Sequence, residues 1–137
     1  MSKEILFFLV DDDADDRLIF TMALSCLHSK IVYVTAKDGE EALEMLKNEE
    51  FTPDFIFLDL NMPRVDGKEC LVEIRKMERL QKVPVYIYST SLQEKDREET
   101  LSLGATGYFI KPYSTTALVS MLSKIIVNSS SPTVKNI

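Results

Sequence analysis

Four places along this 137-residue chain hold side chains whose chemistry could be combined in one site. A carboxylate pair, a lone carboxylate, a hydroxyl and an ammonium each follow a short apolar run, at Asp11-Asp12, Asp59, Ser89 and Lys111. Three carboxylates close together repel one another, and a hard divalent cation relieves that repulsion. Oxygen ligands suit Mg²⁺, which binds few protein groups and readily accepts phosphate oxygens. The residue types therefore predict a magnesium site that handles a phosphoryl group.

The same side chains could bind that phosphoryl group covalently. A lysine and a hydroxyl beside a metal can hold phosphoryl oxygens, and a carboxylate can attack phosphorus to form an acyl phosphate. Asp59 is the best candidate for the nucleophile, because it stands alone after its apolar run. Asp11 and Asp12 are adjacent and suit metal binding better. The remaining acids of that stretch fit a solvated helix start: Asp13, Asp15 and Asp16.

These residues can act together only if the fold brings the ends of their apolar runs to one place. Five runs rich in Val, Ile, Phe or Tyr predict buried strands, over Ile5–Val10, Ile31–Val34, Phe55–Leu58, Val83–Tyr88 and Tyr108–Ile110. Segments with helical periodicity follow them, over Asp16–Leu27, Glu40–Lys47, Lys68–Arg79, Gln93–Leu103 and Thr115–Val127. This alternation predicts an α/β fold of three layers, a (βα)5 doubly wound five-stranded parallel sheet. Ligands bind such sheets beyond the carboxyl ends of the strands, so the candidate residues should converge there.

The chain fits one domain over residues 1–127, followed by a short polar tail over 128–137. Asp38 and Glu41 predict a capping box at the second helix, and Gly104 predicts the end of the fourth.

Composition excludes several classes of partner. With 16 basic and 22 acidic residues, the net charge of −6 argues against nucleic acid. The apolar run Ile5–Val10 is too short to span a membrane. Cys26 and Cys70 form no metal or redox motif and fit a reducing compartment. We therefore expect a cytoplasmic protein with neither a nucleic-acid nor a membrane partner.

Several strings of the sequence resemble the receiver domains of bacterial two-component response regulators, above all the stand-alone regulators similar to CheY. The strings are Leu9-Val10-Asp11-Asp12-Asp13, Pro53 through Pro63 with Asp66-Gly67, Val83-Pro84-Val85 leading to Ser89, and Lys111-Pro112. Together they cover roughly residues 3–127, in matching order and spacing. The resemblance implies a flavodoxin-like fold and a role in a phosphorelay.

The resemblance also implies a role for each matching acid. Asp59 would accept a phosphoryl group from a phosphohistidine on a sensor histidine kinase or a histidine phosphotransfer protein. Asp12 would bind Mg²⁺ directly, and Asp11 largely through water. Asp59 and the backbone carbonyl of Asn61 would complete the protein ligands.

Three further residues would sense the phosphoryl group, again by resemblance. Lys111 would pair with Asp59 and then with phosphoryl oxygens. Ser89 would move toward the phosphoryl group, and Tyr108 would fill the space it leaves. The polar helix between them would adjust, because its few apolar anchors are Leu101 and Leu103.

Two loop residues would modulate how long the acyl phosphate lasts. The family usually has Ala or Gly where this chain has Thr90, and its pattern puts Ser91 beside the approach of the hydrolytic water. The branched side chain of Thr90 would hinder that water, so we expect a longer-lived phosphorylated state.

The first helix carries more apolar residues than the sheet can cover. Ile19, Ala23 and Leu27 are expected to face inward. Leu18 and Met22 would then face outward and contact the phosphoryl donor, with packing beneath a neighbouring helix as the alternative.

The last helix shows a similar excess. Its core side would hold Leu118, Leu122 and Ile125, which leaves Val119, Met121 and Ile126 for an apolar outer face. That face suggests a weak homodimer or a downstream protein target that the sequence does not identify; otherwise the chain is a monomer.

Three other functions share features of this sequence. A phosphatase of the haloacid dehalogenase type also uses an Asp at a strand end, but it needs a second Asp where this chain has Asn61. A receiver-like module that has lost phosphorylation is disfavoured, because all the chemical positions are filled. A receiver cut from a longer kinase or transcription factor stays open, although both ends look natural.

Overall fold

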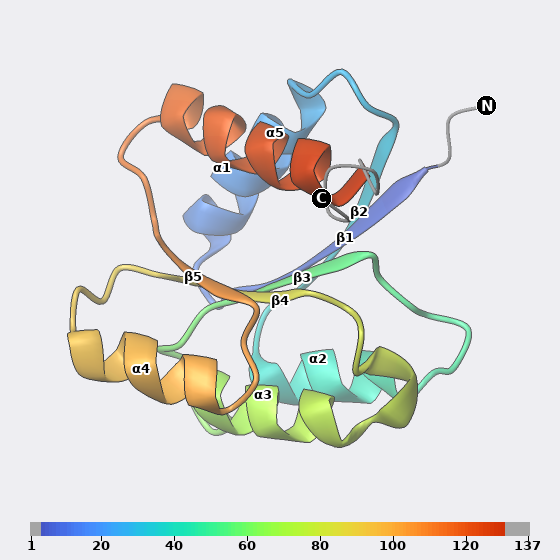
Figure 1. Cartoon of the computed structure of the whole chain (residues 1–137), viewed down its shortest axis with the longest axis vertical. Coiled ribbons are helices and arrows are strands. Elements are labelled where there is room, and N and C mark those ends of the chain that lie inside the picture. Colours follow the sequence, from blue (N-terminus) through green and yellow to red (C-terminus); the bar gives the residue numbers. More distant parts are fainter. Residues whose placement is uncertain (1–3, 131–137) are drawn as a thin grey trace.

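The computed structural model describes residues 4–130 as a central sheet between two layers of helices (Figure 1). The strands are β1 (Ile5–Val10), β2 (Ile31–Ala36), β3 (Phe55–Leu58), β4 (Val85–Ser89) and β5 (Gly107–Ile110). The helices are α1 (Ala14–Ser25), α2 (Gly39–Leu46), α3 (Gly67–Lys76), α4 (Glu94–Ser102) and α5 (Thr115–Ser130). Every strand pairing is parallel, and the order across the sheet is β2-β1-β3-β4-β5. The predicted fold class is confirmed.

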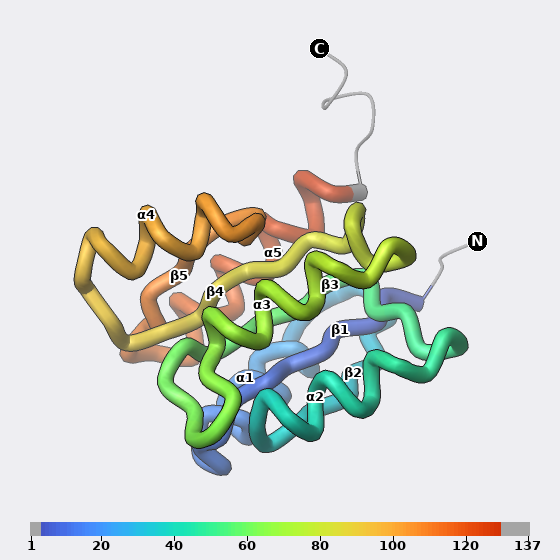
Figure 2. Tube along the Cα trace, turned by 90° about the horizontal axis from the view of Figure 1, so that it is seen from below, coloured from blue at the N-terminus to red at the C-terminus, as the bar shows by residue number. Residues whose placement is uncertain are grey.

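Helices cover both faces of the sheet. α1 and α5 lie on one face, whereas α2, α3 and α4 lie on the other (Figures 1 and 2). Along β1, Phe8 and Val10 join the core on the side of α2 and α3, and Phe7 and Leu9 join the core on the side of α1 and α5. Because both faces are buried, β1 has a continuous apolar sequence rather than an alternating one.

Most element boundaries lie within two residues of the predicted ones. α1 begins at Ala14 because Asp13 caps it, with its Oδ1 atom accepting a hydrogen bond from the Asp16 amide at 3.0 Å. α4 is followed, as predicted, by Gly104, whose φ of +109° suits a glycine at a helix end.

Two helix ends differ more from the prediction. α3 stops at Lys76, because the backbone is extended at Met77 and the rest of the predicted segment forms a 3₁₀ turn over Glu78–Leu80. α5 continues through Ser130, three residues into the predicted tail, and residues 131–137 lie outside the described part of the chain. No helix within residues 4–130 is both long and apolar enough to cross a membrane.

The predicted capping box at α2 is only half formed. The Asp38 carboxylate accepts a hydrogen bond from the Glu41 amide at 2.8 Å, but the Glu41 carboxylate accepts one from the amide of Lys37 instead of Asp38. The complete box is at α3, where Asp66 and Glu69 cap each other's amides. Both aspartates therefore fix loops that follow strands at the same edge of the sheet.

Gly67 brings the first turn of α3 directly against the end of β3. A Cβ atom at this position would lie 2.2 Å from the carbonyl oxygen of Asp59, which only the absence of a side chain permits. The Gly67 amide also donates a hydrogen bond to the Leu60 carbonyl at 2.9 Å. The position of Asp59 is thus tied to that of α3.

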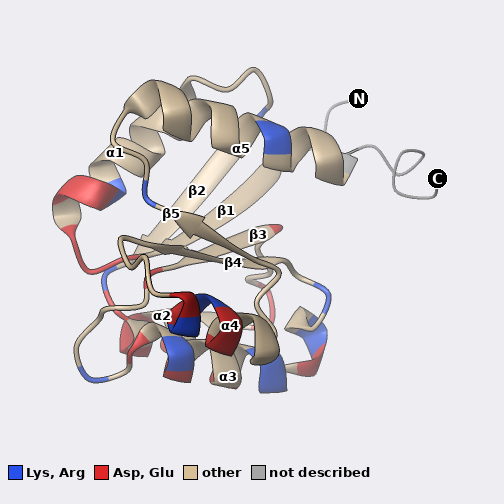
Figure 3. Cartoon of the chain, turned by 60° about the vertical axis from the view of Figure 1, so that its left-hand side comes forward, with Lys and Arg blue, Asp and Glu red and all other residues tan. Residues whose placement is uncertain are grey.

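α4 differs from the other helices in having little apolar contact with the sheet. Its buried residue is Thr100, whereas Leu101, predicted as an anchor, is 39% exposed, and Leu103 is half-buried just after the helix. Charges of both signs cover α4, in contrast to the nearly uncharged α5 (Figure 3). Ion pairs from Lys68 to Asp96 and Glu99 join α4 to α3.

Candidate functional site

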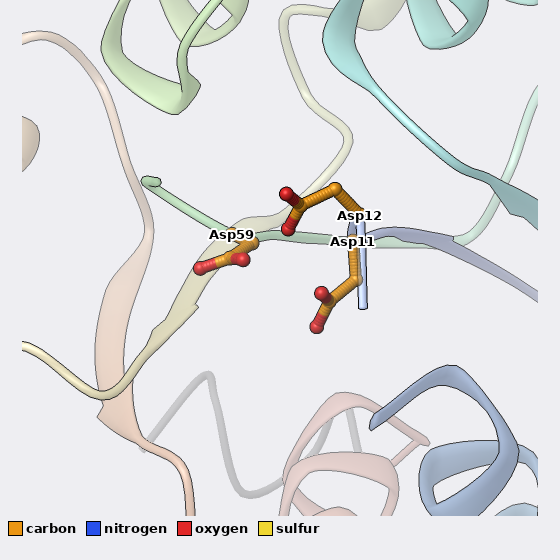
Figure 4. Close-up of side chains that lie close together, drawn as sticks. All are labelled: Asp11, Asp12 and Asp59. Carbon is orange, nitrogen blue, oxygen red and sulfur yellow. The ribbon is translucent and has the colours of Figure 1, made fainter. Parts of the chain in front are cut away.

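The predicted acidic residues meet where the strand order switches. β1 lies between β2 and β3, so Asp11 and Asp59 follow adjacent parallel strands. The Asp59 amide donates to the Val10 carbonyl at 2.9 Å, which extends the pairing by one residue. The side chain of Asp12 leaves the backbone on the side opposite to that of Asp11. All three carboxylates gather beyond the strand ends (Figure 4).

These three carboxylates form the kind of cluster that a divalent cation would occupy. One oxygen from each of Asp11, Asp12 and Asp59 lies within 4.8 Å of the others. Asp11 and Asp59 are buried, whereas Asp12 is exposed. Burial raises the pKa of Asp59 to about 7 against the opposing effect of Lys111, and burial likewise raises the pKa of Asp11. The three carboxylates supply only oxygen atoms, so the donor set fits a hard cation.

Lys111 closes the other side of this cluster. Its Nζ atom lies 3.6 Å from Asp59 Oδ2, as predicted, but closer to two other acids, at 2.9 Å from Asp11 Oδ2 and 2.7 Å from Asp16 Oδ2. Burial opposes the charge of Lys111, but hydrogen bonds to Asp11 and Asp16 and the charges of Asp11 and Asp59 outweigh burial and raise its pKa. Its amide donates to the Ser89 carbonyl at 2.9 Å, which positions the lysine beside β4. Lys111 is therefore a charged, nearly buried partner for oxygens bound at Asp59.

Asp16 is the functional candidate that sequence reasoning missed. It was assigned to a solvated helix start, yet its carboxylate accepts a hydrogen bond from Lys111. The only signal in the sequence is its position in the first turn of α1, which starts at the carboxyl edge of the sheet.

Ser89 and Tyr108 lie on neighbouring strands and both contact the loop after β4. Ser89 is buried, and its Oγ atom accepts a hydrogen bond from the Ser91 amide at 3.1 Å. The half-buried Tyr108 donates its hydroxyl hydrogen to the Ser91 carbonyl at 2.9 Å. The two residues of the predicted switch are thus linked through one peptide segment.

The loop residues Thr90 and Ser91 have different surroundings. Thr90 is exposed, so packing does not fix its side chain. Ser91 donates a hydrogen bond from Oγ to Asp96 Oδ2 at 2.6 Å, and Asp96 also pairs with Lys68 of α3 at 2.8 Å. Asn61 is exposed, and with Asp12, Lys68 and Asp96 it borders a shallow cleft next to the carboxylate cluster.

Arg64 is a second residue that the sequence did not single out. It lies in the loop between β3 and α3 with a φ of +64°, a conformation that is strained for a side chain of this size. Its guanidinium pairs with the buried Asp38 carboxylate at 2.8 Å, which ties this loop to the start of α2. Arg64 therefore helps to hold the backbone that carries Asn61.

The candidate partner-contact residues on α1 are exposed as predicted. Leu18 is 59% exposed and Met22 54%, so they do not pack beneath a neighbouring helix. The prediction that Ile19 faces inward is wrong, because it is 43% exposed. Phe20 and Leu24 pack in the core instead, beside Ala23 and Leu27, which face inward as predicted.

The predicted apolar outer face of α5 does not exist in this form. Ile126 is buried, and Val119 and Met121 are half-buried against the same core. α5 lies beside α1 as well as over the sheet (Figure 1), and two contact surfaces bury a wider stripe of the helix than one would. Leu118, Leu122 and Ile125 are buried, as predicted.

Comparison with known families agrees with this arrangement. The family model of the response regulator receiver domain matches residues 7–123. The matched region contains all the strands except the start of β1, and the whole site described above. The chain belongs to the response regulator receiver family.

Curated relatives include both short and long proteins. Chemotaxis protein CheY-3 of Vibrio cholerae is 33% identical over 125 residues, which cover 91% of this chain and 94% of CheY-3. Sensor histidine kinase CheAY of Helicobacter pylori is 32% identical over 124 residues, which cover 90% of this chain but 15% of CheAY. The chain spans about half the length, or less, of the first curated relatives that it matches.

Solved structures of response regulators superpose over most of the chain. The phosphorylated cyanobacterial phytochrome response regulator RcpA has a TM-score of 0.82 and 32% identity, and the match covers 90% of this chain and 91% of RcpA. The Mn²⁺-bound form of response regulator Rcp1 has a TM-score of 0.78 and 28% identity, and the match covers 88% of this chain and 91% of Rcp1. The flavodoxin-like receiver fold is thereby confirmed.

Proposed function

We propose that this receiver accepts a phosphoryl group on Asp59 from a phosphohistidine of a sensor histidine kinase or a histidine phosphotransfer protein. The observation that carries the proposal is the position of Asp59 between two acids within 4.8 Å and a lysine ammonium at 3.6 Å. Acids on one side can hold a cation, and the ammonium on the other can neutralise phosphoryl oxygens. The protein would catalyse only its own phosphorylation and dephosphorylation and would act on no other substrate.

Asp11, Asp12 and Asp59 would hold the cation, and the backbone carbonyl of Asn61 would complete the protein ligands. Two buried carboxyls with raised pKa values, close to a third carboxylate, favour a bound cation. The Mn²⁺ in the related Rcp1 supports a divalent ion, and the all-oxygen donor set favours Mg²⁺. When bound, the ion would neutralise negative charge on the phosphoryl oxygens.

The transfer itself needs one nucleophile and one leaving group. A carboxylate oxygen of Asp59 forms a bond to phosphorus as the bond from phosphorus to the histidine nitrogen breaks, and the imidazole keeps that electron pair. Lys111 lies close enough to Asp59 to contact the transferred oxygens with a small movement. Ser89, buried at the end of β4, would donate its hydroxyl hydrogen to one of them.

Engagement of Ser89 would transmit the signal. If its Oγ atom turns to the phosphoryl group, the hydrogen bond from the Ser91 amide is lost, and Tyr108 loses its fixed acceptor on the same residue. The loop after β4 and helix α4 would then shift toward a second arrangement. The surface formed by this loop and α4 would bind a downstream protein target.

Leu18 and Met22 would contact the phosphoryl donor. Both are exposed on α1, which begins three residues after Asp11 at the edge of the sheet that holds the site. We propose a monomer or a weak homodimer. The two unpaired cysteines, Cys26 and Cys70, support a cytoplasmic location.

Acetyl phosphate tests the proposed function directly. With Mg²⁺, intact mass should show the addition of one phosphoryl group, and hydroxylamine should remove it. Asp59→Asn should gain none, whereas Asp15→Asn, a change of the same type at an exposed position, should label like the wild type. Labelling of Asp59→Asn at the wild-type rate would refute Asp59 as the acceptor.

A further inference from the structure

We propose that Asp16 is a positioning residue that holds Lys111 in the unphosphorylated protein and thereby limits phosphorylation of Asp59. This inference rests on the proposed function, because it concerns the readiness of the same site. Asp16 lies outside the carboxylate cluster, at the first turn of α1. Asp16 does not line the cleft that Asp12 and Asn61 border, and its carboxylate lies 2.7 Å from the lysine ammonium.

Distances show that Lys111 is engaged mainly by acids other than the nucleophile. Its Nζ atom lies 2.7 Å from Asp16 and 2.9 Å from Asp11, but 3.6 Å from Asp59. The contact with Asp16 is a hydrogen bond as well as an ion pair. Hydrogen bonds between charged groups are the strongest that side chains form, so this contact opposes movement of the ammonium toward Asp59.

The contact joins two residues that lie far apart in the sequence, because 95 positions separate them. Lys111 follows β5 and is 10% exposed, whereas the Asp16 side chain is 33% exposed. A partly exposed carboxylate regains water when its partner leaves. Asp16 can therefore release Lys111 at a moderate cost in free energy, which suits a restraint that a phosphoryl group must overcome.

Helix capping does not explain this side chain. The cap of α1 is Asp13, whose carboxylate accepts the hydrogen bond from the Asp16 amide. A favourable interaction with the positive end of the helix is available equally to Asp15, whose side chain makes no hydrogen bond or ion pair with the described residues. Asp15 is therefore a matched control, with the same charge in the same helical turn.

The experiment compares wild type, Asp16→Asn and Asp15→Asn at one saturating Mg²⁺ concentration. Acetyl phosphate drives phosphorylation, and intact mass follows gain and then loss of the phosphoryl group. Titration calorimetry with beryllofluoride measures the affinity for a phosphoryl mimic. Thermal unfolding shows that each variant is folded, and Asp16→Ser repeats the measurements should Asp16→Asn unfold below the assay temperature.

Asp16→Asn should gain the phosphoryl group about three- to tenfold faster, lose it more slowly, and bind beryllofluoride more tightly by a similar factor. Asp15→Asn should stay close to the wild type in all three measurements, which separates a loss of net charge from the loss of this contact. Equal behaviour of the two variants, or slower phosphorylation of Asp16→Asn, would overturn the role of Asp16. Failure of the wild type to take up any phosphoryl group would instead overturn the proposed function.

Discussion

At the scale of single residues, protonation of Asp59 should make the stability of the metal-free protein depend on pH. Burial raises the pKa of Asp59 from 3.8 to about 7, so the folded protein binds this proton more tightly than the unfolded chain does. The free energy of unfolding should therefore decrease as the pH rises from about 4 to about 7. Thermal unfolding in a chelator should show a lower melting temperature at pH 8 than at pH 5.

Asp59→Asn isolates this contribution, because an amide has no proton to lose in that range. The variant should have the smaller decrease in melting temperature between pH 5 and pH 8, and Asp15→Asn should retain the full decrease. A decrease of equal size in Asp59→Asn and wild type would assign the pH dependence to other groups.

Thr90 should control the lifetime of the acyl phosphate at this same scale. Its side chain is exposed beside Ser89, so truncation removes bulk near the site without opening a cavity. Thr90→Ala should lose the phosphoryl group about tenfold faster at the same Mg²⁺ concentration, which corresponds to about 1.4 kcal/mol of barrier. Intact mass against time measures the decay, and thermal unfolding should show no change. A less stable variant with an unchanged decay would mean that Thr90 merely packs against its surroundings.

At the scale of elements, Lys68 should determine how firmly α4 is held. This lysine of α3 pairs with Asp96 at 2.8 Å and Glu99 at 2.5 Å, both on α4, whose buried residue is Thr100. Asp96 in turn accepts the hydrogen bond from Ser91, so the same contacts restrain the loop that follows Ser89. Few apolar contacts and many polar ones are typical of segments that open locally.

Lys68→Met should therefore increase hydrogen exchange in α4 by about threefold to tenfold. Lys76→Met is the matched control, because Lys76 lies on the same helix but pairs within it, with Glu73 at 3.1 Å. Exchange in α4 that stays unchanged in Lys68→Met would show that backbone and apolar contacts suffice to hold this helix.

Elements were predicted from the sequence most accurately where burial determines most of their residues. Strands such as β1 have side chains in both cores, so their apolar runs were unambiguous. α1 was ambiguous at its start, because Ile19 and Phe20 both fit an apolar stripe, and only the packing against the sheet selects Phe20. The outer face of α5 was predicted wrongly, because the periodicity of a helix does not show that it will pack against another helix as well as the sheet.

At the scale of the whole molecule, phosphorylation should affect one edge of the sheet more than the other. The acids follow β1 and β3 in the middle, whereas Ser89 and Tyr108 lie toward the β5 edge. Beryllofluoride with Mg²⁺ should therefore change hydrogen exchange most across residues 89–108, and less in β2 and α2 at the opposite edge. Changes confined to residues 4–60 would contradict transmission through this loop.

The candidate site was predicted well where it depends on strand ends and poorly where it depends on side-chain reach. Parallel strands bring their carboxyl ends together whatever the side chains are, which placed Asp11, Asp59 and Lys111 correctly. Asp16 and Arg64 were missed, because each acts through a side-chain contact with a residue distant in the sequence. Such contacts become visible only once the layers of the fold are assembled.

The closeness of Gly67 to the carbonyl of Asp59 has a consequence for the length of the segment between them. Residues 60–66 are clamped at both ends, since the Gly67 amide bonds to the Leu60 carbonyl and α3 lies against the strand end without a side chain in between. The segment has no slack to absorb an inserted or deleted residue. Such a change would displace either Asn61 or the helix. Surface loops ordinarily tolerate changes of length, whereas here the number of residues is itself part of the site.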